Sequence, residues 1–243
     1  MRNFGLIGKS LQHSFSPKYF TSKFEKEAIT DASYHAFEIP SIQDFPSLIK
    51  KEQPAGLNVT IPYKEEVIPF LDRLSPIAEE IGAVNTIRFQ DGIMTGHNTD
   101  TIGFAKSIKP FFKKHHERAL IFGTGGANKA VKYVFESLGV RCLTVSRSPE
   151  GMHQIGYDEL HHEGMKHWSI IVNCTPLGTV PNLDEMPNIP MDGIGENHFC
   201  IDLIYNPSET KFLNIAKTNG ALTLNGYDML QFQAEAAWGI WNK

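Results

Sequence analysis

The lysine at position 64 stands where a cation gains little from the fold. The segment GLNVTIPYK, residues 56–64, reads as a short strand that turns at Pro62 and places Lys64 at the start of the next helix. The positive end of a helix dipole repels an ammonium group, and partial burial also favours the neutral amine. A lysine held in this way can exchange protons near neutral pH. The alternative is that Lys64 extends into water and takes no part in chemistry.

A carboxylate, Asp100, lies in the segment HNTDTIG at residues 97–103. An Asp in front of a helix most often caps it by accepting a hydrogen bond from a free backbone N–H. By itself Asp100 therefore indicates the start of a helix, and its chemical role depends on what lies near it.

A glycine-rich turn, GTGGAN at residues 123–128, follows an apolar strand and precedes a helix. Gly123, Gly125 and Gly126 let the backbone turn sharply and approach a pyrophosphate, which the helix N-terminus then stabilises. The same glycines would also suit a tight turn without a ligand. Their place between a strand and a helix favours a Rossmann-type dinucleotide site.

The end of the next strand indicates which dinucleotide this turn would bind. An NAD site usually has an Asp or Glu there for the ribose 2′-hydroxyl. This chain has Ser146, Arg147 and Ser148 instead. A guanidinium can bind a 2′-phosphate, and a charge-assisted hydrogen bond contributes about 1.5 to 3 kcal/mol, so the sequence predicts NADP. Glu150 would weaken this preference, and a surface arginine without a ligand is the alternative.

The elements that must position these residues form two α/β series. The first alternates strands and helices and ends in a hairpin: strands at 4–8, 33–39 and 56–61, helices at 17–28, 41–51 and 63–82, and a hairpin at 83–98. The second begins at residue 118: strands at 118–123, 140–146, 169–174, 199–205 and 221–225, and helices at 129–139 and 210–220. Further helices are expected over 99–116 and 226–241. Ser16 is expected to cap the first helix, with Pro17 as its first residue. Such alternation predicts mostly parallel sheets covered by helices.

Composition limits the classes of function. The 243 residues are 41% apolar, which argues against a disordered chain. The formal net charge of −4 disfavours nucleic acid and anionic membranes as partners. We see no signal peptide and no apolar run of the roughly 18 residues that a membrane span needs. Cys142, Cys174 and Cys200 are expected to be buried thiols of a cytoplasmic protein. The ten histidines lack metal-site spacing, so no metal is expected.

Eight segments, in order along the chain, resemble the successive motifs of the shikimate dehydrogenase family. They are IGKSLQHSFSP (7–17), GLNVTIPYK (56–64), GAVNT (82–86), HNTDTIG (97–103), GTGGAN (123–128), NCTPLG (173–178), DLIYNPSET (202–210) and GYDMLQFQA (226–234). The resemblance implies an α/β fold with two domains. A mostly parallel α/β substrate domain would comprise residues 1–101 and 226–243, and a Rossmann-type NADP-binding domain residues 102–225. The implied activity is the reversible reduction of 3-dehydroshikimate to shikimate with NADPH, by a monomer or homodimer.

The resemblance also implies roles for individual residues. Lys64 would pass a proton to or from the C3 oxygen, and Asp100 would orient Lys64 and hydrogen-bond the substrate. The groups that hold the substrate carboxylate and ring hydroxyls would be Ser14, Ser16, Tyr205, Thr60, Asn85 and Gln233. The cofactor would contact mostly small residues: Gly123, Gly125, Gly126, Ala127, Ser146, Arg147, Ser148, Thr175 and Gly226. Each match also has a structural alternative, such as Ser16 as a helix cap or Gln233 as a solvated helix residue.

Four departures from the family pattern qualify these expectations. The residues KYFTS follow HSFSP where a His-Asn pair is common, and Ser10 replaces a common proline. No second basic residue follows Arg147, which predicts weaker NADP selectivity. The chain stops at WNK soon after Gln233, which predicts a less well covered substrate domain.

Three other functions compete with this interpretation. A relative that uses quinate or NAD would differ in the carboxylate pocket or carry an acid after the second cofactor strand, and this chain lacks that acid. A binding module that had lost catalysis would not need both Lys64 and Asp100. A folate-dependent dehydrogenase of similar layout would not need the serines of HSFSP.

Overall fold

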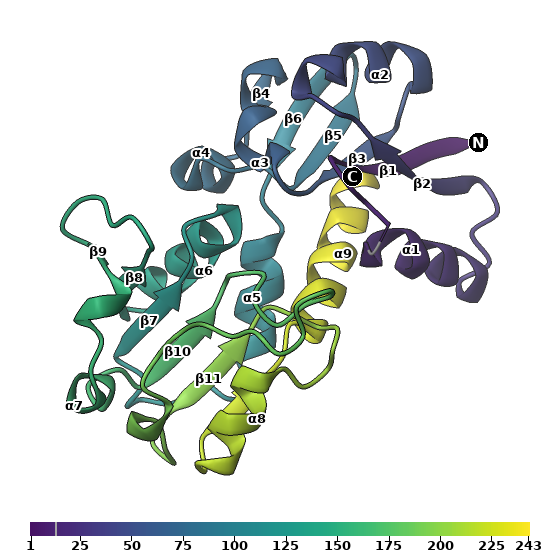
Figure 1. The fold of residues 1–243 in the computed structure, drawn as a ribbon. Coiled ribbons are helices and arrows are strands. Elements are labelled where there is room, and N and C mark those ends of the chain that lie inside the picture. The colour runs from purple at the N-terminus through teal and green to yellow at the C-terminus, as the bar shows by residue number, and fades with distance from the viewer. Residues whose placement is uncertain (13) are drawn as a thin grey trace. The chain divides into compact units, whose positions relative to one another are not determined.

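The chain folds into two compact units. The computed structural model describes residues 1–12 and 14–243, so His13 of the HSFSP segment lies outside it. The first unit comprises Met1–Gly103 with Leu230–Lys243, and the second comprises Phe104–Met229. Each unit is built around a mixed or parallel sheet covered by helices (Figure 1), which confirms the predicted α/β class.

The sheet of the first unit has the strand order β2-β1-β3-β5-β6-β4. Its strands are β1 (Arg2–Gly8), β2 (Ala32–Glu38), β3 (Gly56–Val59), β4 (Arg73–Leu74), β5 (Thr86–Gln90) and β6 (Ile93–His97). β1 pairs in parallel with β2 and β3, whereas β5 is antiparallel to β3 and β6. The turn between β5 and β6 has positive φ at both Asp91 (51°) and Gly92 (75°), as a two-residue hairpin turn requires. The predicted hairpin is confirmed.

Helices cover both faces of this sheet. They are α1 (Phe15–Lys26), α2 (Phe45–Glu52), α3 (Tyr63–Glu66), α4 (Pro76–Ile81), the 3₁₀ turns η1 (Ile42–Asp44) and η2 (Ile68–Phe70), and the C-terminal part of α9 (Tyr227–Trp241). Leu57 and Val59 pack on the face covered by α2, α3 and α4. Phe4 and Leu6 pack on the other face with α1 and α9. The sheet is therefore buried on both sides, which suits the apolar strands of a largely parallel sheet.

The helices of the first unit differ from the sequence expectation at the start of α1 and between residues 63 and 82. α1 begins at Phe15, so Ser16 lies inside its first turn, and the expected cap at Ser16 is wrong. Pro17 is tolerated there because the first backbone N–H groups of a helix have no partner within it. The helical stretch expected over 63–82 is divided by Pro69 and Pro76 into α3, η2, β4 and α4.

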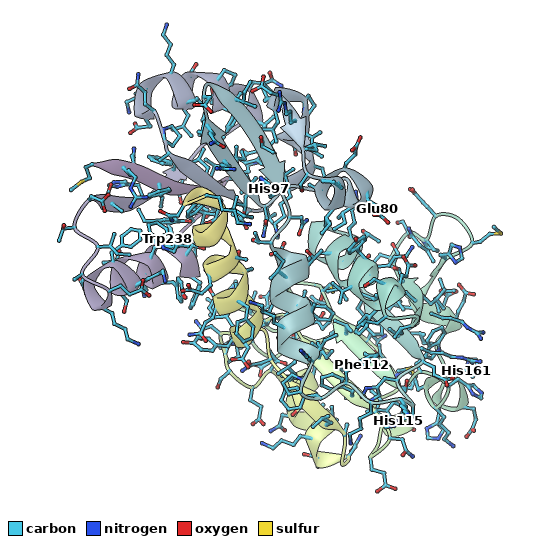
Figure 2. The ribbon with its side chains drawn as sticks, turned by 180° about the vertical axis from the view of Figure 1, so that it is seen from behind. Glu80, His97, Phe112, His115, His161 and Trp238 are labelled. Carbon is cyan, nitrogen blue, oxygen red and sulfur yellow. The ribbon has the colours of Figure 1, made fainter. Side chains whose placement is uncertain are left out.

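The helix that follows the hairpin, α5 (Asp100–Ile108), is shorter than the expected 99–116. Pro110 cannot donate a backbone hydrogen bond, and its ring clashes with the preceding turn, so the helix ends before it. The basic residues at 113–116 lie beyond the helix. His115, among them, is labelled in Figure 2.

The last turn of α9 covers one end of the first sheet. Trp241 is 8% exposed, stacks on Phe4 with ring centroids 4.9 Å apart, and donates Nε1–H to the Ile87 carbonyl at 3.0 Å. Trp238, labelled in Figure 2, meets the Phe4 ring edge-on at 5.3 Å. The expectation that this part of the chain is less well covered is therefore not met at Trp238 and Trp241.

The second unit contains a parallel sheet with the order β12-β11-β10-β7-β8-β9. Its strands are β7 (Arg118–Phe122), β8 (Arg141–Val145), β9 (Gln154–Ile155), β10 (Ile170–Asn173), β11 (Phe199–Asp202) and β12 (Leu222–Leu224). Counted from β7, this is the 3-2-1-4-5-6 order of a dinucleotide-binding Rossmann fold. The Rossmann-type class predicted for this part of the chain is confirmed.

The helices of the second unit also lie on both sheet faces. They are α6 (Gly126–Ser137), α7 (His162–Met165), α8 (Lys211–Thr218) and the 3₁₀ turns η3 (Tyr157–Glu159) and η4 (Met191–Gly193). Val131 and Phe135 of α6 pack with Ile121 on one face, together with the end of α5. Phe212 of α8 and Met165 of α7 pack on the opposite face. This arrangement brings the ends of β7, β8 and β10 together at one edge of the sheet (Figure 1).

Candidate active site

Lys64 and Asp100 form a close ion pair within the first unit. Lys64 Nζ donates to Asp100 Oδ2 at 2.6 Å, and the two side chains are 16% and 9% exposed. Lys64 lies on α3, which is a single turn, so its dipole is weak and does little to disfavour a cation. Asp100 supplies the carboxylate that pairs with the Lys64 side chain. The Asp100 carboxylate balances the charge of Lys64.

Asn85 holds the second oxygen of Asp100. Its Nδ2 donates to Asp100 Oδ1 at 2.8 Å, while its Oδ1 accepts the Thr99 backbone N–H at 2.7 Å. Thr99 Oγ1 also lies 3.4 Å from Gln233 Oε1 on α9. Hydrogen bonds thus connect four residues expected in the site. Lys64, Asp100 and Asn85 are linked directly, and Thr99 links Asn85 to Gln233.

The other residues of the first unit that are expected to bind substrate make no direct hydrogen bond to the ion pair in the described part of the chain. Thr60 is half-buried at the end of β3, and Ser14 is half-buried in front of α1. Ser16 is buried and hydrogen-bonds Tyr34. In the described part of the chain, no hydrogen bond joins the side chains of Ser14, Ser16 or Thr60 to the ion pair.

Tyr205, also expected at the substrate carboxylate, belongs to the second unit. It is half-buried just after β11, and burial raises the pKa of its phenol. The hydroxyl therefore stays protonated at neutral pH and can donate a hydrogen bond.

The glycine-rich turn joins β7 to α6 in the second unit. Gly123 has φ of 98°, and a Cβ there would lie 3.3 Å from the Cys174 carbonyl, so a side chain would be strained. Gly125 precedes α6, and Gly126 and Ala127 form its first turn. A Cβ on Gly125 would meet no atom within 4 Å, so this backbone faces open space. Free N–H groups at the start of a three-turn helix beside such space fit the pyrophosphate of a dinucleotide.

The groups expected at the 2′-phosphate follow β8, the neighbour of β7 in the sheet. Ser146 is buried and its Oγ accepts the Ser148 N–H at 3.1 Å, which fixes the turn. Arg147 is exposed, and no ion pair joins it to Glu150 in the described residues. The guanidinium is therefore available to an anion, and these residues fit NADP.

Two further residues expected at the cofactor have clear structural roles. Thr175 Oγ1 donates to Asn173 Oδ1 at 2.6 Å, and its methyl group lies beside Gly123. Gly226 packs so tightly that a Cβ there would lie 2.0 Å from the Leu203 carbonyl oxygen. Both residues shape the edge of the sheet where the glycine turn lies.

Comparison with known proteins decides the family. The family description "Shikimate dehydrogenase substrate binding domain" matches residues 6–87. A Clostridium botulinum shikimate dehydrogenase (NADP(+)) is 38% identical over 98% of this chain and 95% of its own. The chain belongs to the shikimate dehydrogenase family. The motif resemblance is confirmed.

Solved structures of shikimate dehydrogenases have the same fold. The Peptoclostridium difficile shikimate dehydrogenase 1 matches with a TM-score of 0.87 at 38% identity, over 100% of this chain and 92% of that chain. A Thermus thermophilus shikimate 5-dehydrogenase, in complex with NADP(H) and shikimate, matches with a TM-score of 0.87 at 29% identity. That match covers 99% of this chain and 93% of that chain.

Asp202 is a buried acid of the family motif DLIYNPSET that sequence reasoning left without a role. Its Oδ2 accepts the Thr210 hydroxyl at 2.6 Å, and its Oδ1 accepts Asn173 Nδ2 and the Ile204 N–H at 3.1 and 3.0 Å. Thr210 caps α8. Burial raises the pKa of Asp202 to about 6, although these donors act in the opposite direction. An acid at the end of a buried strand, followed by a helix cap, is the signal that could have identified it.

The raised pKa of Asp202 predicts a specific dependence of stability on pH. Because the folded state binds the proton more tightly than the unfolded chain, whose pKa is near 3.8, the contribution of Asp202 to stability is largest below pH 4 and is lost as pH rises to about 6. The loss is about 3 kcal/mol at 1.36 kcal/mol per pKa unit. Asp202→Asn stays neutral, so its free energy of unfolding relative to wild type should rise by a similar amount between pH 4 and pH 7. Urea unfolding at each pH measures this, and parallel curves for the two proteins would contradict it.

Within the described part of the chain, the cysteines and histidines form no cluster that could act as a second reactive centre. Cys200 is buried, whereas Cys142 and Cys174 are only partly buried, which corrects the expectation for these two. Burial raises the pKa of Cys142 and Cys200 to about 12, so both stay as thiols. Among residues 1–12 and 14–243, no cluster of His, Cys, Asp and Glu could hold a metal, and no helix has the length and apolar character of a membrane span.

Proposed function

We propose that this chain is an NADP-dependent dehydrogenase that reversibly reduces 3-dehydroshikimate to shikimate. The observation that carries the proposal is the Lys64–Asp100 ion pair, held at 2.6 Å in a member of the shikimate dehydrogenase family. Reduction of a ketone needs a proton donor for the oxygen, and an ammonium group fixed by a carboxylate supplies one.

In the first unit, one residue transfers the proton and another orients it. Lys64 gives its proton to the C3 oxygen during reduction and takes one back from the hydroxyl during oxidation. Asp100 keeps Lys64 in place, because both of its oxygens are held, by Lys64 and by Asn85. When bound, NADPH supplies the hydride for C3.

The remaining polar residues select the substrate. In this proposal Ser14, Ser16 and Tyr205 hold the carboxylate, and Thr60, Asn85 and Gln233 hold ring hydroxyls. A site that hydrogen-bonds hydroxyl groups rejects analogues without them, because its buried polar groups would be left unpaired. Gln233 can present its amide nitrogen, since its oxygen already faces Thr99.

The cofactor residues of the proposal line one edge of the second sheet. Gly123, Gly125, Gly126 and Ala127 would bind the pyrophosphate, Ser146, Arg147 and Ser148 the 2′-phosphate, and Thr175 and Gly226 the remainder of NADP. We assign substrate binding to residues 1–101 with 226–243 and cofactor binding to 102–225. We also propose that the enzyme works in the cytoplasm as a monomer or homodimer, and three free cysteines suit a reducing compartment.

Replacing Arg147 should reduce selectivity for NADP over NAD. Arg147→Ala removes the guanidinium, so the KM for NADP should rise about 10- to 100-fold, while the KM for NAD stays within about twofold. Initial rates with each cofactor at saturating shikimate measure this. Arg141→Ala, at the exposed opposite end of β8, is the control and should change neither constant. An equal change of both KM values in Arg147→Ala would contradict the role.

The absorbance of reduced nicotinamide tests the proposed function directly. Purified protein is given shikimate or quinate, each with NADP or with NAD. We expect turnover to be highest with shikimate and NADP. Turnover limited to quinate would identify a different dehydrogenase, and no turnover of any pair by folded protein would favour a ligand-binding module.

A further inference from the structure

A buried chain of hydrogen bonds leads from β2 to the carboxylate of Asp100, entirely within the first unit. Tyr34 OH donates to Asn58 Oδ1 at 2.8 Å, and Asn58 Nδ2 donates to Thr86 Oγ1 at 3.2 Å. Thr86 Oγ1 donates to Asn85 Oδ1 at 3.0 Å, and Asn85 Nδ2 donates to Asp100 Oδ1 at 2.8 Å. None of the five residues is more than 9% exposed. Water therefore competes little with these bonds, which strengthens each of them.

The direction of every bond is fixed by groups that can only donate or only accept. Asp100 accepts and the Thr99 backbone N–H donates, so the Asn85 amide must direct its nitrogen to Asp100. Asn58 Nδ2 also donates to the Asn85 carbonyl at 3.2 Å, which can only accept. The Asn58 oxygen must then face Tyr34, whose hydroxyl must donate. All donors in the chain therefore point toward Asp100.

We propose that Tyr34 is a positioning residue for the reaction, an inference that rests on the proposed function. Its hydroxyl fixes the Asn58 amide, which holds Thr86 and Asn85 in the orientation that aligns Asp100. Without that hydroxyl, Asn58 Oδ1 becomes a buried acceptor without a donor, and this cost favours rotation of the Asn58 amide. A small displacement of the group that orients a proton donor lowers the rate, because reactivity depends steeply on geometry.

Tyr34→Phe removes the hydroxyl and keeps the ring, which packs face to face with Phe20 at 4.4 Å. We expect kcat for shikimate oxidation to fall about five- to tenfold, with the KM for NADP unchanged. Thr86→Val, which cuts the same chain closer to Asp100, should lower kcat by at least as much. The matched control is Tyr63→Phe. Tyr63 is 2% exposed and its hydroxyl donates to the Ile39 carbonyl at 2.7 Å, outside the chain, so kcat should be unchanged.

A double-mutant cycle separates positioning from a general loss of stability. If Tyr34 acts through Asn85, Tyr34→Phe should lower kcat less than twofold in an Asn85→Ala background, because residues of one hydrogen-bond network do not act additively. A kcat of Tyr34→Phe within twofold of wild type, or an equal loss in both backgrounds, would overturn the proposal.

Hydrogen exchange of the Thr99 amide gives a readout that does not need turnover. This amide donates to Asn85 Oδ1 at 2.7 Å, so it should exchange at least about fivefold faster in Tyr34→Phe than in wild type or Tyr63→Phe. Equal exchange in all three proteins would overturn the proposal even if wild type did not oxidise shikimate. Faster exchange without any turnover would support the coupling and reject the proposed function alone.

Discussion

Replacing Lys64 with alanine should lower kcat for shikimate oxidation about 10³-fold. General acid–base catalysis contributes about 10²- to 10⁴-fold, and Lys64 is the ammonium group that Asp100 holds at 2.6 Å. The loss should appear in kcat rather than in binding, because the carboxylate and hydroxyl contacts assigned to other residues remain. Steady-state absorbance gives kcat, and calorimetric titration with shikimate gives the dissociation constant.

Lys51→Ala provides the control for the Lys64 prediction. Lys51 is exposed on α2 of the same unit and pairs only with its neighbour Glu52 among the ion pairs of the described residues. Its removal should leave kcat unchanged. A Lys64→Ala protein that binds shikimate and retains a kcat within about tenfold of wild type would rule out Lys64 as the proton-transfer group.

Replacing Gly226 with alanine should prevent the second unit from folding stably. The new Cβ would lie 2.0 Å from the Leu203 carbonyl oxygen and 2.5 Å from its carbonyl carbon, and this backbone belongs to the segment just after β11. Backbone atoms cannot yield as a flexible side chain can. We expect a loss of about 4 kcal/mol or more, at the upper end of what single substitutions produce.

Urea unfolding and the melting temperature measure the effect at Gly226. Gly125→Ala is the matched control, since a Cβ there meets nothing within 4 Å. Gly125→Ala should unfold within about 1 kcal/mol of wild type and instead weaken NADP binding, because its methyl group would enter the space proposed for the pyrophosphate. Equal stability of Gly226→Ala and wild type would show that the packing against Leu203 is not a constraint.

The elements that sequence predicts best are those with a strong local signal. The hairpin was predictable because alternating strands flank Asp91-Gly92, a pair that tolerates positive φ. The strand β9 (Gln154–Ile155) was missed because two residues show no periodicity. The expected helix is longer than α5 because the basic residues at 113–116 are typical of a helix C-terminus, whereas Pro110 has the stronger effect and ends the helix.

The members of the candidate site were predictable by type, but their contacts were not. Lys64 and Asp100 are 36 residues apart, and only the folded chain shows that they meet. Their spacing could not show that a carboxylate compensates the charge of Lys64. The chain from Tyr34 to Asp100 was also hidden, because it depends on the registers of β1 with β2 and of β3 with β5, which no local pattern encodes.

The most direct test of the account follows the hydrogen on C3 of shikimate. Wild-type protein is incubated with NADP and shikimate that carries deuterium at C3, and the reduced cofactor is weighed by mass spectrometry, with Lys64→Ala run in parallel. We predict NADPH that contains one deuterium from wild type, and at most a trace from Lys64→Ala in the same time. Reduced cofactor without deuterium, or consumption of shikimate without reduced cofactor, would contradict the account.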